Sequence, residues 1–383
     1  MTESAHLAHG LAGDQQVPDW PPLDAREVSA VLMRYPVLGA SGNILWHSPR
    51  PLSAAARVAT AGGEVFIKRH PRQVRDGGTL AEEHRFAAHV RQRGIPVPVV
   101  LSDAAGRSAF EQGDWVYEVH RCAVGTDVYR DAFSWSSIGG IAHARVAGAM
   151  LARLHIAAEG FDAPQRGTHR LVARADMLGA HEPLDALAEQ LGTRPALAAY
   201  LGERDWRGEI ARAIRPWQAR AAAGIGRQDA LWTHGDWHVS NLCWSDASDA
   251  ARITDVLDFG LCARTFALFD LATAIERNAI AWLDMGQGPI ARTDLALALV
   301  EGYHCVRPLT DDDLDVLADV LPVVHVDFAL SEVEYFEGVT CRRDHADVAY
   351  HTFLLGHARW FASDEGRGLL DALRHADRAF VVQ

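Results

Sequence analysis

The sequence has few of the features that are typical of secreted proteins or of proteins stabilised by disulfides or structural zinc ions. Its five cysteines are scattered and odd in number, and no two are spaced as CxxC. This pattern argues against a disulfide framework and a structural zinc site, and it favours a reducing compartment. The first 22 residues contain no basic segment followed by an apolar core, so the sequence predicts no secretory signal and we expect a cytoplasmic protein.

Long apolar runs and an excess of basic residues are also missing. The apolar stretch 320–330 is interrupted by His325 and Asp327 and is too short to span a bilayer, so we expect no membrane association. The 37 basic and 50 acidic side chains give a formal net charge of −13. Nucleic acids and anionic membranes bind basic faces, so neither is an expected partner. The charge is compatible with a cationic substrate, but solubility explains it equally well.

The composition that is present is that of a globular protein, with 49% apolar and 23% charged residues. A chain of 383 residues can bury a substantial core as one bilobal unit or two domains, in a monomer or a homodimer. We predict three segments: a flexible N-terminal arm, a nucleotide-binding lobe, and a catalytic and substrate-binding lobe, over residues 1–24, 25–123 and 124–383. No internal repeat is visible.

The first half of the chain is rich in strand patterns, and the second half in helix patterns. Short strands are predicted at 44–46, 56–59, 64–68 and 114–120, with a hairpin turn at 61–63 and one clear helix at 79–93. Beyond residue 138 we predict a long helix at 138–158, two or three helices within 160–229, short strands at 231–233, 242–244 and 253–257, and helices at 267–284, 293–306, 311–339 (broken near Pro322) and 345–361.

The most informative residues lie among the short strands of the second half. Asp236 is followed five positions later by Asn241, and Asp258 opens an Asp-Phe-Gly triplet behind a β-type run. An acid that orients a hydroxyl, with an amide and a second acid that hold magnesium on a triphosphate, are the groups that phosphoryl transfer from Mg·ATP requires. Three such groups in this order are a specific pattern.

With these motifs the chain resembles the aminoglycoside phosphotransferase and choline kinase-like family, a branch of the protein-kinase-like fold. The resemblance covers roughly residues 40–300 and is supported by the segments Ile95–Pro98, Leu151–His155 and Phe269–Ala272. It implies an α+β bilobal fold, with a small N-terminal antiparallel β lobe, a larger, mainly helical C-terminal lobe, and ATP and Mg²⁺ in the cleft between them.

The resemblance also implies roles for individual residues. Asp236 corresponds to the catalytic base, and Asn241 and Asp258 to the magnesium ligands. Lys68 ends a predicted strand where kinases place a lysine on the α- and β-phosphates. Its expected partner is a glutamate on the following helix, for which the spacing favours Glu83 over the neighbouring Glu82.

Other nucleotide contacts are less well marked. The connection between the first two strands lacks the glycines of a phosphate loop, and Gly39 to Gly42 lies too far upstream, so backbone amides near Ser53 are the expected phosphate cap. The resemblance places the interlobe hinge at 119–123, with Val119 and Arg121 as adenine contacts. His234 and His238 are expected to organise the loop rather than bind metal, and Asp270 to act as a structural acid.

The acceptor site is expected on helices after the metal-binding loop. Asp327, Ser331 and Glu334 fall near one helical face, with Glu332 beside it. Such a wall would suit an aminoglycoside-like or amino-alcohol cation, but a solvated acidic face is equally consistent with the pattern.

We therefore predict an ATP-dependent phosphotransferase that acts on the hydroxyl of a small molecule. A bacterial stress-type protein Ser/Thr kinase and a non-catalytic nucleotide-binding module are the alternatives. No segment resembling an activation loop follows Gly260, which disfavours the first alternative. The presence of Lys68, Asp236, Asn241 and Asp258 together disfavours the second.

Overall fold

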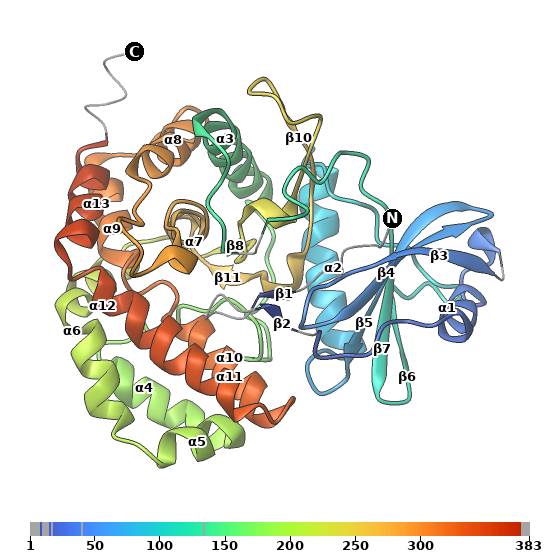
Figure 1. Cartoon of the computed structure of the whole chain (residues 1–383), viewed down its shortest axis with the longest axis horizontal. Coiled ribbons are helices and arrows are strands. Elements are labelled where there is room, and N and C mark those ends of the chain that lie inside the picture. The colour runs from blue at the N-terminus through green and yellow to red at the C-terminus, as the bar shows by residue number, and fades with distance from the viewer. Residues whose placement is uncertain (1–7, 10–14, 17, 40, 133–134, 377–383) are drawn as a thin grey trace.

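The computed structural model describes residues 8–9, 15–16, 18–39, 41–132 and 135–376. It has two lobes, with the β-sheet lobe at the right of Figure 1 and the helical lobe at the left. The predicted α+β bilobal class is confirmed. Within the described part of the chain, no helix is both long enough and apolar enough to cross a membrane.

The N-terminal lobe is built on a five-stranded antiparallel sheet in the order β3-β4-β5-β7-β6. Three of the four predicted strands lie inside longer ones, the fourth (114–120) is shifted by one residue, and β6 was missed. The strands of this lobe are β3 Gly42–His47, β4 Ala54–Thr60, β5 Gly63–Pro71, β6 Ala109–Gln112 and β7 Trp115–Arg121. A separate two-stranded pair, β1 Ala8–His9 and β2 Gln15–Gln16, precedes them.

The two faces of this sheet contact different parts of the protein, because successive side chains of a strand point to opposite faces. Val65 and Ile67 of β5 are fully buried against helix α1 Ala25–Leu32. Lys68 lies on the opposite face, toward the second helix, α2 Gly77–Gln92, and the cleft. It pairs across the ladder with Glu118 of β7, so both side chains belong to the same face.

Both helices of this lobe begin at an aspartate that accepts a backbone hydrogen bond from the first turn. Asp76 and Thr79 form a capping box that starts α2 two residues before its predicted start. Asp24 caps α1 in the same way through the Glu27 amide. Helix α1 was not predicted from the sequence, although Asp24 is an N-cap residue that marks its start. Phe86 of α2 belongs to the large core of the C-terminal lobe, so α2 bridges the two lobes.

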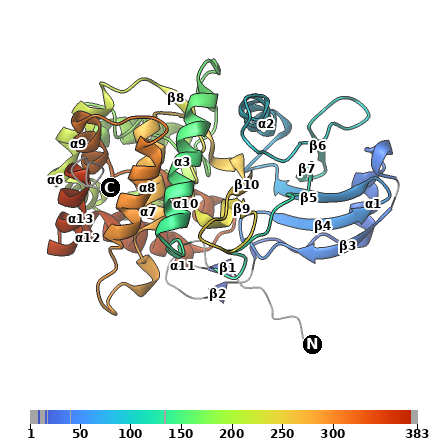
Figure 2. The ribbon, with the colours of Figure 1, turned by 90° about the horizontal axis from the view of Figure 1, so that it is seen from above.

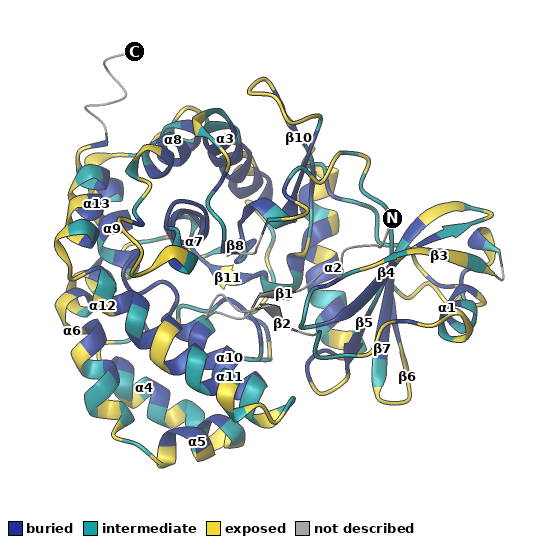
Figure 3. Cartoon of the chain, in the orientation of Figure 1, coloured by how far each residue is buried: buried dark blue, intermediate teal, exposed yellow. Residues whose placement is uncertain are grey.

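The C-terminal lobe surrounds its core with helices, whose inward faces are buried in Figure 3. Its first helices are α3 Ile141–Ala158, α4 Pro183–Gln190, α5 Pro195–Gly202 and α6 Trp206–Ile225. The later ones are α7 Ala267–Asn278, α8 Thr293–His304, α9 Asp311–Val320, α10 Val326–Gly338, α11 Arg343–Asp347, α12 Ala358–Trp360 and α13 Asp364–Arg374, with a π-helix at Val348–His357. The predicted break near Pro322 separates α9 from α10, whereas the helix predicted at 267–284 ends at Asn278.

Figure 2 shows the sheet and the helical lobe side by side, with the short strands of the C-terminal lobe near the junction. These strands are β8 Leu231–Thr233, β9 Leu242–Trp244, β10 Ile253–Val256 and β11 Ala263–Thr265. The end of the predicted arm also bridges the lobes. The Trp20 indole nitrogen donates to the Tyr335 hydroxyl at 3.1 Å, and that hydroxyl donates to Asp19 at 2.9 Å. The Trp20 ring packs edge-on against Trp115 of β7. Residues 1–7, 10–14 and 17 of the predicted arm lie outside the described residues.

Candidate active site

Two antiparallel pairs bring the motif residues to one end of the C-terminal lobe. Strand β9 pairs with β10, and β8 pairs with β11. Asn241 precedes β9 and Asp258 follows β10, so the antiparallel register places them at the same end of the hairpin. The Leu257 amide donates to the Asn241 carbonyl at 2.8 Å and closes that end. The loop that carries Asp236 follows β8 in the chain.

Asp236 is held by side chains that favour its ionised form. Arg277 of α7 donates to Oδ1 at 2.8 Å, and the Asn241 amide nitrogen donates to Oδ2 at 3.0 Å. His238 Nε2 lies 3.3 Å from the same Oδ2. Burial alone would raise the pKa of Asp236, but His238 and Arg277 hold it well below its usual value. Asp236 is therefore a carboxylate fixed in one orientation.

The loop around Asp236 rests on a buried acid, as predicted. Asp270 of α7 accepts hydrogen bonds from the His234 and Gly235 amides, at 2.8 and 2.9 Å, and contacts the His155 ring at 3.1 Å. The His234 ring donates to the Leu257 carbonyl at 2.8 Å and links the two functional loops. Gly235 has φ +77°, and a Cβ there would lie 2.7 Å from the Leu261 carbonyl oxygen. The scaffold roles predicted for Asp270 and His234 are confirmed.

Lys68 is the only lysine in the chain. Its ammonium donates to Asp258 Oδ1 at 3.0 Å, across the cleft between the lobes. Burial lowers the pKa of Lys68, but Asp258 and Glu118 more than offset this and raise it, so the ammonium stays charged. The Asp258 side chain keeps 43% of its accessible surface, and the cleft is therefore open at this point.

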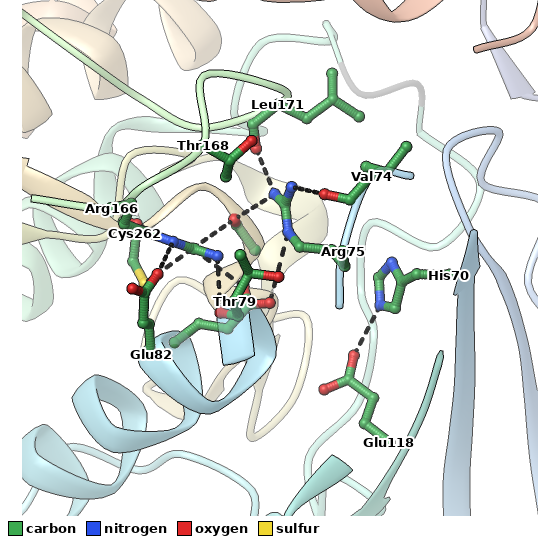
Figure 4. A network of polar contacts seen from close by, with 12 residues as sticks. His70, Val74, Arg75, Thr79, Glu82, Glu118, Arg166, Thr168, Leu171 and Cys262 are labelled. Atoms are coloured by element: carbon green, nitrogen blue, oxygen red, sulfur yellow. Dashed lines mark hydrogen bonds and ion pairs between the residues drawn. The ribbon is translucent and has the colours of Figure 1, made fainter. Parts of the chain in front are cut away.

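The predicted pairing of Lys68 with Glu83 is corrected by the structure. Glu83 contacts Arg75 at 3.7 Å and Arg166 at 3.5 Å, and Glu82 contacts Arg166 at 3.3 Å. Figure 4 shows these two guanidinium groups beside the start of α2. They satisfy Glu83 because they reach it from either side, while Asp258 is the acid within hydrogen-bond distance of Lys68.

The two arginines also donate to backbone carbonyls of the opposite lobe. Arg75 binds the Leu171 and Gly260 carbonyls, at 2.5 and 2.9 Å. Arg166, which belongs to the C-terminal lobe, donates to the Thr79 carbonyl of α2 at 2.9 Å. Glu83 therefore sits at the centre of an ionic latch between the lobes, which we define as Arg75, Glu83 and Arg166.

The nucleotide side of the cleft departs from the prediction at Val119. This residue is fully buried in the core under α1, and its carbonyl accepts from the Leu101 amide at 2.8 Å. Its side chain is therefore turned away from the cleft, into the core that contains α1. Arg121, Cys122 and Ala123, the last three residues of the predicted hinge, line the cleft where β7 ends.

The connection between β3 and β4 lines the cleft as predicted. Ser53 lies at its end, buried and facing the cleft. Arg50 lies in the same connection and also lines the cleft, which the sequence did not predict. Burial lowers the pKa of Arg50, although Asp236 and Asp258 lie near enough to raise it.

The three predicted acceptor residues are buried and do not line the cleft. Glu334 is bound by Arg170 at 3.0 Å and Arg194 at 2.6 Å, and the Ser331 hydroxyl donates to the Phe328 carbonyl. Burial raises the pKa of Asp327 to about 7. The assignment of Asp327, Ser331 and Glu334 to the acceptor site is therefore wrong, and so is the alternative of a solvated face, because α10 is packed on that side.

A neighbouring face of α10 lines the cleft instead. Phe328, Glu332 and Phe336 follow one another at i, i+4 and i+8 and all face it. Glu332 is 8% exposed, and among the described residues its Oε2 has no hydrogen-bond partner. Burial raises its pKa to about 8, Arg277 lowers it, and the nearby Asp236 raises it again. Their helical spacing is visible in the sequence and could have predicted this shared face.

All these groups surround a single cleft of about 1120 Å³ that runs from the sheet to α10. Lys68, Arg50 and the end of β7 lie on its N-terminal wall, while Asp236, Asn241, Asp258 and Glu332 lie on the opposite wall. The volume suits a nucleotide and a small second substrate. The donor set of one carboxylate and one amide oxygen suits Mg²⁺, which prefers oxygen ligands.

A two-lobed fold with this arrangement of lysine, two acids and amide defines the class of kinase-like phosphotransferases. The model of the phosphotransferase enzyme family matches residues 43–309. The chain belongs to this family.

Individual relatives are distant. A homoserine kinase from Methylobacillus flagellatus is 24% identical over 294 residues, which are 73% of this chain and 80% of the relative. Among solved structures, a microcompartment-associated aminopropanol kinase has a TM-score of 0.57 at 17% identity, covering 92% of this chain and all of the other. An aminoglycoside phosphotransferase from Alicyclobacillus acidocaldarius has a TM-score of 0.56 at 15% identity, covering 94% of this chain and 98% of the other.

Proposed function

We propose that this phosphotransferase moves the γ-phosphate of ATP to a hydroxyl group of a small molecule that also carries an amine. The observation that carries the proposal is the single cleft shared by Lys68, Asp236, Asp258 and the buried acid Glu332. The first three are the groups of phosphoryl transfer, and the fourth is suited to a cationic acceptor.

Asp236 would orient the acceptor hydroxyl and accept its proton. Phosphoryl transfer passes through a loose transition state, so catalysis depends on positioning and on electrostatic stabilisation. The contacts of Arg277 and Asn241 keep the carboxylate ionised and fixed, which is what positioning requires. The proton would leave the hydroxyl for a carboxylate oxygen as the new oxygen–phosphorus bond forms and the bond between the γ-phosphorus and the bridging oxygen breaks, with ADP as the leaving group.

Asn241 and Asp258 are the residues that would hold Mg²⁺. Among the described residues, the side-chain hydrogen bonds of Asn241 run through Nδ2, which leaves Oδ1 for the metal. The Asp258 carboxylate faces the open cleft. Mg²⁺ bound there would neutralise phosphate charge during transfer.

Lys68 and Arg50 would hold the phosphates. Lys68 is paired with Asp258, and a nucleotide would give its ammonium a second anionic partner. Arg50 supplies charge where glycine-loop amides are absent, and Ser53 lies beside it in the same connection. Cys122 and Ala123, after the end of β7, are the residues whose backbone would meet the adenine.

The amine of the acceptor would pair with Glu332. A cation that enters this buried position favours the ionised carboxylate, so binding would release the proton that burial retains near neutral pH. Phe328 and Phe336 on either side would pack against the carbon skeleton. The acceptors named for the three similar proteins, homoserine, aminopropanol and aminoglycosides, each carry both a hydroxyl and an amino group.

The test is a comparison of acceptors that differ only in the amine. ATP consumption and product mass are measured with L-homoserine, 1-amino-2-propanol and ethanolamine, and in parallel with their respective analogues 4-hydroxybutyrate, 1,2-propanediol and ethylene glycol. We expect phosphorylation of at least one amine-bearing acceptor, and at least tenfold lower kcat/KM for its matched amine-free analogue. Equal rates for the two sets would contradict the role of Glu332. Phosphorylation of a generic protein substrate but of no small molecule would point to the protein-kinase alternative.

Nucleotide binding can be tested separately by chemical labelling of Lys68, because this residue is the only lysine in the chain. An amine-reactive acyl-phosphate analogue of ATP should modify Lys68, and excess Mg·ATP should prevent the modification. Peptide mass spectrometry separates this product from the N-terminal amine. Labelling elsewhere, or labelling that Mg·ATP leaves unchanged, would show that Lys68 does not face the phosphates.

A further inference from the structure

The N-terminal lobe contains a compact group of imidazoles that phosphoryl transfer does not use. Three histidines surround the carboxylate of Glu118. His84 Nε2 and His120 Nε2 lie 2.5 and 2.8 Å from Oε2, and His70 Nε2 lies 3.0 Å from Oε1. Figure 4 shows the last of these contacts, at the edge of the interlobe network.

The fold brings these residues together from three elements. Glu118 and His120 are two positions apart on β7, so they share a face of the sheet. His70 is two positions beyond Lys68 on β5, and Lys68 pairs with Glu118, so His70 lies on that face too. His84 comes from α2, which covers it, and its ring meets that of His120 at 81° with centroids 5.8 Å apart.

The cluster combines one carboxylate with three imidazoles in a mostly buried site. Burial would raise the pKa of Glu118, but His120 and the hydrogen bonds from the histidines hold it well below its usual value. Burial lowers the pKa of His70. The cluster thus brings a carboxylate together with imidazole nitrogen atoms, which are common metal ligands.

We propose that His84, Glu118 and His120 bind a divalent transition-metal ion of the Zn²⁺ class in the wall of the cleft, with His70 orienting Glu118 from behind. In the described residues, this is the one group of three or more potential ligands whose donor atoms all lie within 4.8 Å of one another. His70 contacts the other carboxylate oxygen, which leaves Oε2 for the metal. An outer partner of this kind commonly orients a ligand and tunes a metal site.

The geometry requires only a small adjustment. Zn²⁺ lies about 2.0–2.2 Å from nitrogen and oxygen ligands, which places neighbouring ligand atoms of a tetrahedron about 3.4 Å apart. The observed separations of 2.5 and 2.8 Å widen by less than about 1 Å to admit the ion. Rotation of the two imidazoles supplies that movement. The cleft, which all four residues line, supplies the entry path and a water for the fourth position.

This site is chemically distinct from the one formed by Asn241 and Asp258. Two imidazole nitrogens and one carboxylate select zinc, cobalt or nickel over magnesium, which prefers oxygen ligands. The site also joins α2 to β7, and so it would fasten the helix that carries Glu83 to the central sheet. A metal that binds only the folded chain raises its unfolding temperature.

The test uses the full chain freed of metal with a chelator. Zn²⁺ binding is measured by competition with a chromophoric chelator, and Co²⁺ binding by its visible ligand-field absorption. We expect one Zn²⁺ per chain, a Co²⁺ spectrum typical of four- or five-coordination with nitrogen ligands, and a higher melting temperature with zinc. His84→Gln and His120→Gln should each weaken zinc binding at least 100-fold, and His70→Gln about 10- to 100-fold.

The matched control is His181→Gln, because the His181 side chain is 96% exposed and lies outside the cluster. It should bind zinc as the wild type does. Wild-type affinity in His84→Gln and His120→Gln would overturn the proposal. If those variants fail to fold, the proposed site is tested in the wild type by anomalous X-ray scattering from crystals soaked in ZnCl₂. A peak between His84 and His120 supports the site, and no peak there overturns it.

Discussion

At the scale of single residues, the cleft is defined by how each charged group is balanced. Asp236 is held ionised by Arg277, whose guanidinium also stacks 4.1 Å above the Trp135 ring. Lys68 is balanced by Asp258. Glu332 has no comparable partner in the part of the chain that the structure describes, and it keeps its proton near neutral pH. Paired groups are suited to the transfer step, and the unpaired acid is suited to binding a cation.

The first prediction concerns the proposed base. Asp236→Asn keeps the shape of the side chain but removes the proposed proton acceptor, so kcat should fall by roughly 10² to 10⁴. The affinity for Mg·ATP should change little, because Asp236 is not among the expected metal ligands. Steady-state kinetics and nucleotide titration separate the two effects. Asp249→Asn, at an exposed turn between β9 and β10, is the control. Full activity in Asp236→Asn would remove this residue from the mechanism.

The second prediction is a pH dependence of acceptor binding. The pKa of Glu332 is raised to about 8, so below that pH the free enzyme holds the carboxyl largely protonated. A cationic acceptor should therefore bind more tightly as pH rises from 6.5 to 8, with the dissociation constant falling on the order of tenfold. Calorimetric titration with the amine-bearing acceptor, repeated across this pH range, measures how the dissociation constant changes with pH.

The matched variants for that experiment are Glu332→Gln and Glu189→Gln. Glutamine cannot ionise, so Glu332→Gln should bind weakly and without the pH slope. Glu189 is exposed on α4, and its variant should behave as the wild type. A slope that persists in Glu332→Gln would mean that another group near the acceptor titrates.

At the scale of elements, close contacts between backbones fix the helices that carry the site. Helices α3 and α8 cross where each presents a glycine. A Cβ on Gly148 would lie 2.0 Å from the Leu299 carbonyl oxygen, and one on Gly302 would lie 1.9 Å from that of Arg145. This crossing supports His155 of α3, which contacts Asp270 beneath the catalytic loop.

The third prediction tests this crossing. Gly302→Ala places a methyl group against backbone that cannot rotate away, and should lower the free energy of unfolding by roughly 1–3 kcal/mol or more. Gly368→Ala in α13 is the control, since a Cβ there meets nothing within 4 Å. It should be neutral or stabilise by up to about 1 kcal/mol, because alanine is the better helix former. Urea unfolding measures the free energy of unfolding of both variants. Equal changes in the two variants would contradict the close packing at Gly302.

At the scale of the whole molecule, the two lobes are joined by more than the hinge. The latch of Arg75, Glu83 and Arg166 fastens α2 to the C-terminal lobe, and Trp20 links Trp115 of β7 to Tyr335 of α10. Both links cross the edges of the cleft, so they set how far the lobes can open around a nucleotide.

The fourth prediction concerns the latch. Glu83→Gln leaves two buried guanidinium groups without their shared acid, and removal of one partner from a buried ion pair commonly costs about 3–5 kcal/mol. The neighbouring Glu82→Gln is the control, because the Glu82 side chain is 26% exposed, against 6% for Glu83, and solvent screens its contact. Chemical unfolding compares the two. A similar small loss in both variants would show that Glu83 does not hold the lobes together.

Much of the fold was predictable, and the misses have local causes. Long periodic helices and the hairpin at 61–63 are properties of short segments, so the strands around that turn and the long helices were placed to within a few residues. The helix at 25–32 was missed although Asp24 marks its start. Asp236, Asn241 and Asp258 meet in one cleft because they flank short strands whose partners are close in sequence, and Lys68 faces the same cleft from within β5 of the sheet.

The sequence by itself determined the lobes, the order of the chemical groups and the family, because those depend on local patterns and spacing. Only the tertiary structure decided which charges meet. In the folded chain, Glu83 pairs with two arginines and Val119 lies in the core. Asp327, Ser331 and Glu334 are buried, and Glu332 lines the cleft. These outcomes depend on which face of a strand or helix is packed, and on partners as far away as 164 residues, such as Arg170 and Glu334. Such contacts leave no trace in the spacing of neighbouring residues.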